Sequence, residues 1–462
     1  MNLSFGILYT ALLIPSAFFT IYLWKRHKFS AFGILNASFI LYYILTPMIL
    51  LIFPSLFSEN LGRFTSIVYN STINQQIKGL SITIVAYLVI VATYFLINMN
   101  KSIKRVYRVT YAYTLDKSMK IIYHWGLILF FIGSISISLF FVELGGISAA
   151  ISFSNSLRGL GVEPENYYGA AGALFRMLSF LILGSVYCFK IYTKQNKSMT
   201  VRLLLWSSYF FSGIYLVFNA GRLPILFFLI PFILEYFYKR NKNLFSSLIL
   251  LFIGTILFAN LFDLVLLSIS SNNYAFIQNQ NGLLENLVEA FQDLSYPYSN
   301  ILMIDSMNET YGFRFGQDYF IWIFDILPSR LFSIIGINIP ETISINSITS
   351  MFHYSLKASR GGVPTDIITL GMRQLGVAGV TLNMFVFSLL ALYVDKLSRR
   401  TRKENFLLVA RIDLLFFSLI SNNDLTAIVR GSLYIILLVF ILKKVSRIKK
   451  NPENELYFSK GT

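Results

Sequence analysis

Long apolar runs, each about twenty residues long, recur along the chain and are separated by polar segments. A run of this length matches the hydrocarbon thickness of a bilayer, whereas a soluble core needs no such uninterrupted stretch. We therefore expect an all-α, polytopic membrane protein, a single domain over residues 1–462 with about eleven transmembrane helices. The predicted helices lie near 4–23, 31–53, 79–98, 121–142, 169–190, 203–219, 223–238, 244–267, 369–394, 406–421 and 425–442.

Composition supports a membrane protein and narrows its chemistry. Hydrophobic residues make up 55% of the chain and charged residues only 13%, about half the charged fraction of an ordinary soluble domain. The first apolar run lacks a basic leader and a small-residue cleavage site, so we interpret it as a retained helix. The single cysteine, Cys188, excludes an intrachain disulfide and a cysteine-rich metal site.

The polar segments alternate in charge. One set is short and rich in Lys and Arg, and the other is aromatic and poor in Lys. Basic segments favour the cytoplasmic side of a membrane, so the alternation predicts a periplasmic N-terminus and a cytoplasmic C-terminus. This placement also explains the net charge of +17 without a nucleic-acid partner. The basic segments are 25–28, 99–120, 190–202, 239–242, 395–405 and the tail from 443.

The segment from 268 to 368 is far longer than a connection between helices requires. Its apolar pieces at 282–294 and 319–328 are typical of interfacial or re-entrant helices that cover a cavity at the membrane surface. Long outer loops usually carry function, which makes this one the first place to look for a site. A small periplasmic cap with only a packing role remains the alternative.

Arginine dominates the basic residues that lie outside the cytoplasmic segments. Orientation alone does not distinguish Arg from Lys, but a planar guanidinium can bind phosphate or carboxylate through two parallel hydrogen bonds. The alternative is that arginine is better tolerated near the membrane because its side chain reaches the interface. These arginines are Arg63, Arg158, Arg176, Arg222, Arg314, Arg330, Arg360, Arg373, Arg411 and Arg430.

Titratable and flexible residues are concentrated between His353 and Asp366, directly before the helix predicted at 369–394. Gly361 and Gly362 would let backbone N–H groups approach an anion closely, and Arg360 could clamp it. His353 is the only histidine predicted on the outer side. A surface histidine without a catalytic role is the alternative interpretation.

Three charges fall within the last two predicted helices. Arg411, Asp413 and Arg430 should face the interior of the bundle, because an unpaired charge at the centre of a membrane helix costs roughly 2.5–3.5 kcal/mol. A structural ion pair between Asp413 and Arg430 is the favoured interpretation. A charged wall of the functional site is the other.

Two outer segments share one spacing, an arginine followed by ten residues and a glycine: Arg158 to Gly169, and Arg360 to Gly371. With this pair of motifs, the chain resembles the Wzy-type O-antigen polymerases, which join oligosaccharide repeat units at bacterial inner membranes. The likeness extends over most of the chain as architecture, but motif-level matches cover only a few dozen residues. Further matches are Asn219-Ala220-Gly221-Arg222, Leu327-Pro328-Ser329-Arg330 and the glycines at 371, 376 and 379.

The resemblance implies that a growing glycan leaves its undecaprenyl diphosphate carrier and joins a new lipid-linked unit on the periplasmic side. It implies that Arg158, Arg222 and Arg360 bind the diphosphate and glycan. Supporting contacts would come from Gly169, Arg314, Arg330, Gly361, Gly362, Gly371 and Arg373. The acceptor hydroxyl needs a base, for which His353 and Asp366 are the candidates, and Arg360 is the third residue assigned to catalysis.

The partners implied are lipid-linked glycan as donor and acceptor, membrane lipid, and possible regulator and flippase proteins. A metal-dependent mechanism is disfavoured because the chain has no Asp-x-Asp, HExxH or P-loop sequence; we expect no cofactor. Two alternatives stay open: the related O-antigen ligase, and a transporter such as the lipid-linked oligosaccharide flippase. A transporter usually has duplicated halves, which the sequence does not show.

Overall fold

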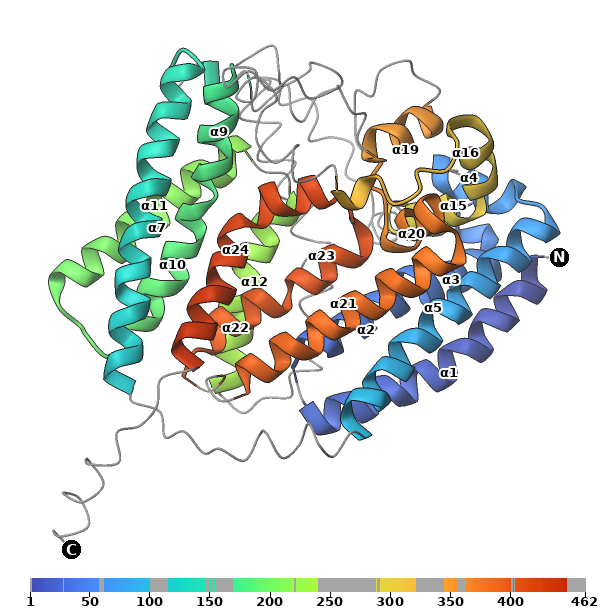
Figure 1. Ribbon diagram of the computed structural model, residues 1–462, viewed down its shortest axis with the longest axis horizontal. Helices are drawn as coiled ribbons and strands as arrows, with labels where there is room; N and C mark the ends of the chain where they lie inside the picture. Colours follow the sequence, from blue (N-terminus) through green and yellow to red (C-terminus); the bar gives the residue numbers. More distant parts are fainter. Residues whose placement is uncertain are drawn as a thin grey trace, which may run out of the picture.

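Every regular element in the described part of the chain is a helix, as predicted. Figure 1 shows the computed structural model, in which long helices run side by side and shorter ones gather at one end. The structure describes residues 2–27, 29–57, 62–99, 115–146, 149–150, 153, 169–219, 222–239, 288, 291–320, 345–354, 363–399, 402 and 404–446.

Seven helical segments in the described part of the chain are long and apolar enough to cross a membrane. They confirm the prediction of a polytopic, helical, membrane-embedded protein. The number eleven stays a prediction: the run at 244–267 lies outside the described residues, and the helices at 223–238, 406–421 and 425–442 are not among the seven. The seven segments are Leu3–Arg26, Ala31–Ile52, Ile73–Asn98, Ser118–Glu143, Ala171–Tyr192, Met199–Phe218 and Val377–Ser398.

The observed helices lie close to the predicted apolar runs, because a helix places its apolar residues against neighbouring helices or lipid. Predicted and observed ends usually differ by only a few residues. The unbroken helices are α1 (Asn2–His27), α5 (Ile73–Met99), α7 (Leu115–Glu143), α11 (Met199–Asn219), α12 (Arg222–Lys239) and α24 (Leu425–Ser446).

The helix predicted at 31–53 is interrupted. It consists of α2 (Ala31–Ile40), a π-helical turn η1 (Leu41–Leu45) and α3 (Thr46–Ile52). Pro47 explains the interruption, because a proline lacks an N–H and its ring collides with the carbonyl four residues earlier. The wider π turn relieves that collision.

Three other predicted helices are also divided. Gly376 separates α20 (Ile367–Leu375) from α21 (Val377–Ser398), so the expected continuous helix at 369–394 was wrong. Its φ of 61° suits glycine, which has no side chain to collide with the backbone. Milder breaks divide 169–190 into α9 (Ala170–Ser179) and α10 (Leu181–Tyr192), and 406–421 into α22 (Phe406–Asp413) and α23 (Leu415–Ser421).

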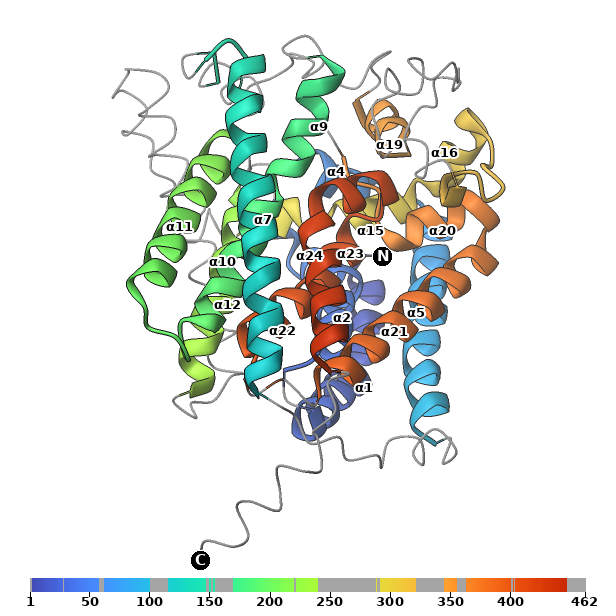
Figure 2. The same cartoon turned by 60° about the vertical axis from the view of Figure 1, so that its left-hand side comes forward.

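Short helices fill the described parts of the predicted outer loops. They are α4 (Arg63–Asn70), α15 (Tyr296–Leu302), α16 (Ile304–Tyr311) and α19 (Ile345–Tyr354). Figures 1 and 2 show them beside α20 at one end of the bundle. The ends of α1, α5, α21 and α24 that precede the basic segments lie at the other end, which we call the basic end.

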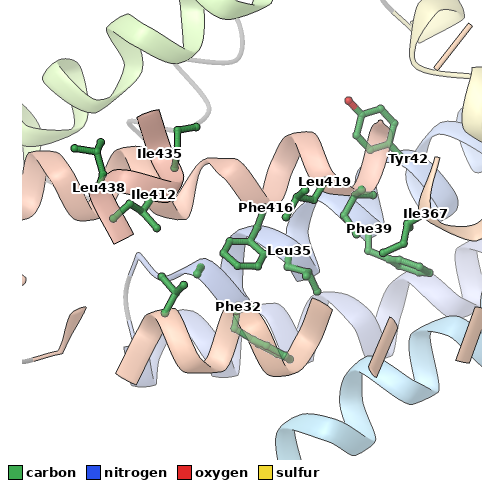
Figure 3. Packing of buried hydrophobic residues seen from close by; sticks show 14 of the residues in the cluster. Phe32, Leu35, Phe39, Tyr42, Ile367, Ile412, Phe416, Leu419, Ile435 and Leu438 are labelled. Atoms are coloured by element: carbon green, nitrogen blue, oxygen red, sulfur yellow. The ribbon is translucent and has the colours of Figure 1, made fainter. Parts of the chain in front are cut away.

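The core runs through the middle of the bundle, where α2 meets the C-terminal helices. Figure 3 shows Phe32, Leu35 and Phe39 of α2 beside Phe416 and Leu419 of α23. All five side chains are buried. The C-terminal hairpin is therefore an integral part of the bundle and holds α2 from one side.

A buried ion network closes the basic end. Arg402 lies 3.4 Å from Asp395 of α21 and 3.1 Å from Asp413 of α22, and it also donates to the carbonyl of Phe29. Asp395 in turn accepts from the backbone N–H groups at the start of α2. Asp413 is therefore paired with Arg402, and the suggested pairing with Arg430 was wrong.

Candidate functional site

Asp366 lies at the centre of a buried polar network at the end of the bundle opposite the basic end. It is the N-cap of α20, and its Oδ1 accepts from the backbone N–H groups of Ile368 and Thr369 at 3.1 and 3.0 Å. Its Oδ2 accepts from the Thr369 hydroxyl at 2.6 Å. A carboxylate at this position satisfies helix donors and interacts favourably with the helix dipole.

Two further donors reach Asp366 from distant parts of the chain. The Tyr43 hydroxyl donates to Oδ1 at 2.6 Å, and the Asn300 amide donates to Oδ2 at 3.1 Å. Tyr43 lies in the π turn η1, and π turns often occur at functional sites. Burial raises the pKa of Asp366, although these hydrogen bonds oppose the shift.

Asn300 connects Asp366 to His353. Its amide nitrogen donates to Asp366 and to the carbonyl of Pro364 at 3.2 Å, and its amide oxygen lies 2.6 Å from Nε2 of His353. Because both partners of the amide nitrogen are acceptors, the amide oxygen must face His353 and Nε2 must donate to it. The hydrogen-bond pattern therefore assigns the neutral tautomer of His353 with its lone pair on Nδ1.

Within the described part of the chain, the Nδ1 atom of His353 is buried and has no hydrogen-bond partner, and the whole residue is only 2% exposed. A buried polar atom without a partner is costly in a protein interior. The neighbouring groups do not satisfy it: the ring of Phe64 meets His353 edge-on, with centroids 5.4 Å apart. An unpartnered acceptor held in a fixed orientation is suited to receive a proton or a hydroxyl group.

Burial and a nearby positive charge keep the imidazole of His353 neutral. Burial is the main cause that lowers its pKa from 6.5 to about 4, and the positive charge of Arg63 lowers it further. Both Arg63 and Phe64 belong to α4, so this short helix controls the electrostatics and the packing around the imidazole. At neutral pH, His353 is thus an acceptor and not a cation.

Arg373 lies two turns along α20 from the network and is fully buried. Its Nη1 donates to the carbonyl of Met307 at 2.7 Å and to Oδ1 of Asn308 at 3.2 Å. Its Nε and Nη2 have no hydrogen-bond partner. Burial lowers the pKa of Arg373 to about 10, with a smaller contribution from the charge of Arg314. Two donors of a buried cation are therefore without a partner in the described part of the chain.

The guanidinium of Arg314 is already bound within the protein. Its guanidinium binds both oxygens of Asp318, at 2.6 and 2.7 Å, and Gln374 also donates to that carboxylate. The backbone N–H of Arg314 donates to the carbonyl of Arg373 at 3.0 Å. The structure thus makes Arg314 an anchor of the segment after α16.

Gly371 has a packing role in the structure. A Cβ atom at this position would lie only 2.5 Å from the backbone nitrogen of Val380, so α20 and α21 can approach this closely only through a glycine. Gly169 is the N-cap of α9, and its N–H donates to Glu143 at 3.2 Å. Arg222 is the first residue of α12. The remaining predicted site residues lie outside the described residues: Arg158, Arg330, Arg360, Gly361 and Gly362.

The predicted and the observed site overlap in part. His353 and Asp366, chosen from the sequence, belong to one network, whereas Tyr43, Asn300 and Arg63 were missed as members of it. A tyrosine four residues before Pro47 was the available signal for Tyr43, because it falls where the helix must be distorted. Within the described residues, no group of three or more His, Cys, Asp or Glu side chains could hold a metal ion.

Comparison with known proteins adds no family: no family model, curated protein or solved structure matches the chain.

Proposed function

We propose that this protein is a bacterial inner-membrane polymerase that joins undecaprenyl-diphosphate-linked oligosaccharide repeat units, with His353 as the base. The observation that carries the proposal is the unpartnered Nδ1 of His353, held by the network that runs through Asn300 to Asp366. The paired arginine–glycine spacings, the predicted outer location of the segment and the seven apolar helices support the same conclusion.

The reaction needs one bond formed and one broken. The acceptor hydroxyl donates a hydrogen bond to Nδ1, and its oxygen attacks the anomeric carbon of the growing glycan. As that C–O bond forms, the bond to the lipid diphosphate breaks, the diphosphate leaves with the electron pair, and the hydroxyl proton passes to Nδ1. Because the pKa of His353 is about 4, the imidazole is a weak base. It therefore orients the hydroxyl first and takes the proton late.

Asp366 and Asn300 position the imidazole in this scheme. The two oxygens of Asp366 accept five hydrogen bonds, which leaves the carboxylate poorly placed to receive a substrate proton. Its charge instead favours the imidazolium that forms when Nδ1 is protonated, through the polarised amide of Asn300. We therefore assign the base to His353 and the positioning role to Asp366.

The leaving diphosphate requires cations and N–H donors that are in place before the bond breaks. Arg373 supplies two unpartnered guanidinium donors on the helix that Asp366 caps. We assign the remaining stabilisation to Arg158, Arg222, Arg330 and Arg360, with backbone donors from Gly361 and Gly362, as the resemblance implies. Attack at the anomeric carbon and departure of the diphosphate occur on the same glycan. His353 and the groups that bind the diphosphate must therefore reach one ligand.

Analysis of the surface polysaccharide of a deletion strain and its complemented parent tests the proposal. A polymerase predicts a single repeat unit on the acceptor in the deletion strain and a ladder of lengths after complementation. Long chains that accumulate on the lipid carrier would instead identify a ligase. Lipid-linked single units trapped on the cytoplasmic side would identify a transporter, and an unchanged ladder would refute all three.

A further inference from the structure

The segment that follows α16 displays aromatic rings on its surface. Between residues 311 and 320, which we call the aromatic loop, Tyr311, Phe313, Phe315 and Phe320 have exposed fractions of 38%, 50%, 79% and 67%. Exposed rings this close together are uncommon on a surface that faces water and often mark contact with a membrane or a partner.

Three residues of the aromatic loop, Arg314, Asp318 and Tyr319, hold it together and against the bundle. Arg314 and Asp318 form their two-pronged ion pair inside the loop. Asp318 is bound by Gln374 of α20, and the Tyr319 hydroxyl donates to Asn383 of α21 at 2.7 Å. These polar contacts fix the loop on the bundle, while its exposed Phe rings face outward.

The backbone enforces this arrangement. Phe315 has a φ of 46° and is the one non-glycine residue with a positive φ in the described part of the chain. A left-handed conformation costs a residue other than glycine about 1–2 kcal/mol, and it persists where the surroundings impose it. Gly312 and Gly316, with φ of 71° and 85°, flank the strained position. The strain projects the most exposed ring of the loop away from the bundle.

The outward surface of the loop continues a surface of α21. The exposed apolar residues of this candidate span recur at the spacing of one helical face, as Leu382, Phe385, Val386, Leu390 and Tyr393. In a membrane-spanning helix such a face contacts lipid tails. The bond between Tyr319 and Asn383 fixes the loop next to the first turns of this face. Figure 2 shows the segment after α16 beside α20 and the start of α21.

We propose that the aromatic loop is an interfacial anchor that inserts between the lipid headgroups and acyl chains at the end of the bundle opposite the basic end. Its occupant is membrane lipid, because its rings extend the lipid-facing surface of α21 at the level where aromatic residues favour the membrane interface. Through Asp318 and Gln374 the anchor sets the depth of α20, and hence of the network at Asp366. The proposal holds whether or not the protein is a polymerase.

Site-specific fluorescence tests the anchor. Cys188 is buried, so a Cys188→Ala background carrying Phe315→Cys can be labelled at one position with the environment-sensitive dye NBD. In phosphatidylcholine nanodiscs, we expect a blue-shifted emission and at least about twofold stronger quenching by doxyl groups near the lipid headgroup than by iodide in water. Glu309→Cys, labelled on the polar exposed face of α16, is the control and should be quenched mainly by iodide.

Phe313→Cys provides a second position if the strained residue does not tolerate replacement. Strong iodide quenching and no doxyl quenching at both positions, in protein that elutes as a folded species, would overturn the proposal. A blue shift that develops only after addition of glycan or a second protein would also overturn it, because the lipid would then not be the occupant.

Discussion

Two buried aspartates, one at each end of the bundle, show how differently the fold can stabilise the same group. Asp395 at the basic end binds the N-terminal backbone of α2 and shares Arg402 with Asp413. Asp366 at the other end binds the N-terminal backbone of its own helix and receives its other hydrogen bonds from neutral groups.

The network at the basic end contains a cation, whereas the side chains that donate to Asp366 are all neutral. At the basic end Arg402 bridges two carboxylates and ties helices together, although Oδ1 of Asp413 has no hydrogen-bond partner in the described part of the chain. At the opposite end, the chain of hydrogen bonds leads from Asp366 through Asn300 to a histidine that retains an unpartnered nitrogen. A buried acceptor without a partner costs stability at either end, but the one on His353 belongs to a neutral imidazole that can take up a proton, whereas Asp413 is held by its cation.

The largest expected effect follows from His353→Ala. Removal of the base should reduce chain elongation by about 10²- to 10⁴-fold, because the variant lacks the acceptor at Nδ1. Repeat-unit ladders and turnover of the purified protein measure the loss. His124→Ala, a change of an exposed histidine far along the chain, is the matched control and should leave the ladder intact. Equal ladders from both variants would remove His353 from the site.

Next in size is the effect of Arg402→Leu on stability. This change leaves the buried carboxylates of Asp395 and Asp413 without their cation, and it should lower the free energy of unfolding by about 3–5 kcal/mol. Thermal unfolding in detergent measures it, with the exposed Lys197→Ala as control. Turnover per folded molecule should not change. A selective loss of turnover in stable protein would show that the basic end is not merely structural.

Asn300→Ala should have a smaller effect on catalysis than loss of the histidine. The imidazole remains but loses the partner that fixes its tautomer and orientation, so we expect kcat to fall about 10- to 100-fold. KM should stay nearly constant, because Asn300 does not touch the substrate in our scheme. Asn98→Ala, which alters an amide on α5, is the control. A rise in KM with constant kcat would contradict a positioning role.

The smallest effect concerns the pH profile. Wild-type kcat/KM should stay high above about pH 4 and fall as His353 becomes protonated below it, since the neutral form is the acceptor. Over the window between 6.5 and about 4, the unfolded chain binds a proton that the folded chain does not, so stability also declines as the pH falls.

Arg63→Gln sharpens this test, because removal of the positive charge should move the acid limb of the profile to higher pH. Lys78→Gln removes another cation, one that pairs with Asp305, and should leave the limb in place. An acid limb near the ordinary pKa of histidine in the wild-type protein would contradict the assignment of a buried, neutral His353.

Hydropathy predicted where the helices lie, but it could not predict where they break. The π turn before Pro47 and the sharp turn at Gly376 depend on backbone conformations to which apolar periodicity is insensitive. The turn at Gly376 matters most, because it lets α20 fold against α21 through Gly371. Local stereochemistry determines where these two helices break. Pro47 and Gly376 were the only signals of the breaks in the sequence.

The candidate site was predictable only where its titratable residues lie close together in the sequence. His353 and Asp366 stand out because they are titratable residues in one short segment. Tyr43 lies 323 residues from Asp366, and Asn300 lies 66 residues from it. A neutral residue that completes a network across such separations has no local pattern to identify it. Arg402, the partner of Asp413, lies only 11 residues away, but it falls in the basic segment 395–405, which the charge pattern assigned to the cytoplasmic side.

The central claim is that this protein elongates lipid-linked glycan at the site that contains His353. The most direct test is a reconstituted reaction that contains the purified protein in liposomes and undecaprenyl-diphosphate-linked repeat units as the only substrate. We predict a ladder of longer lipid-linked products and release of undecaprenyl diphosphate from the wild-type protein, and neither from His353→Ala. A wild-type protein that is folded and yields no elongated product, or a His353→Ala protein that yields the same ladder, would contradict the account.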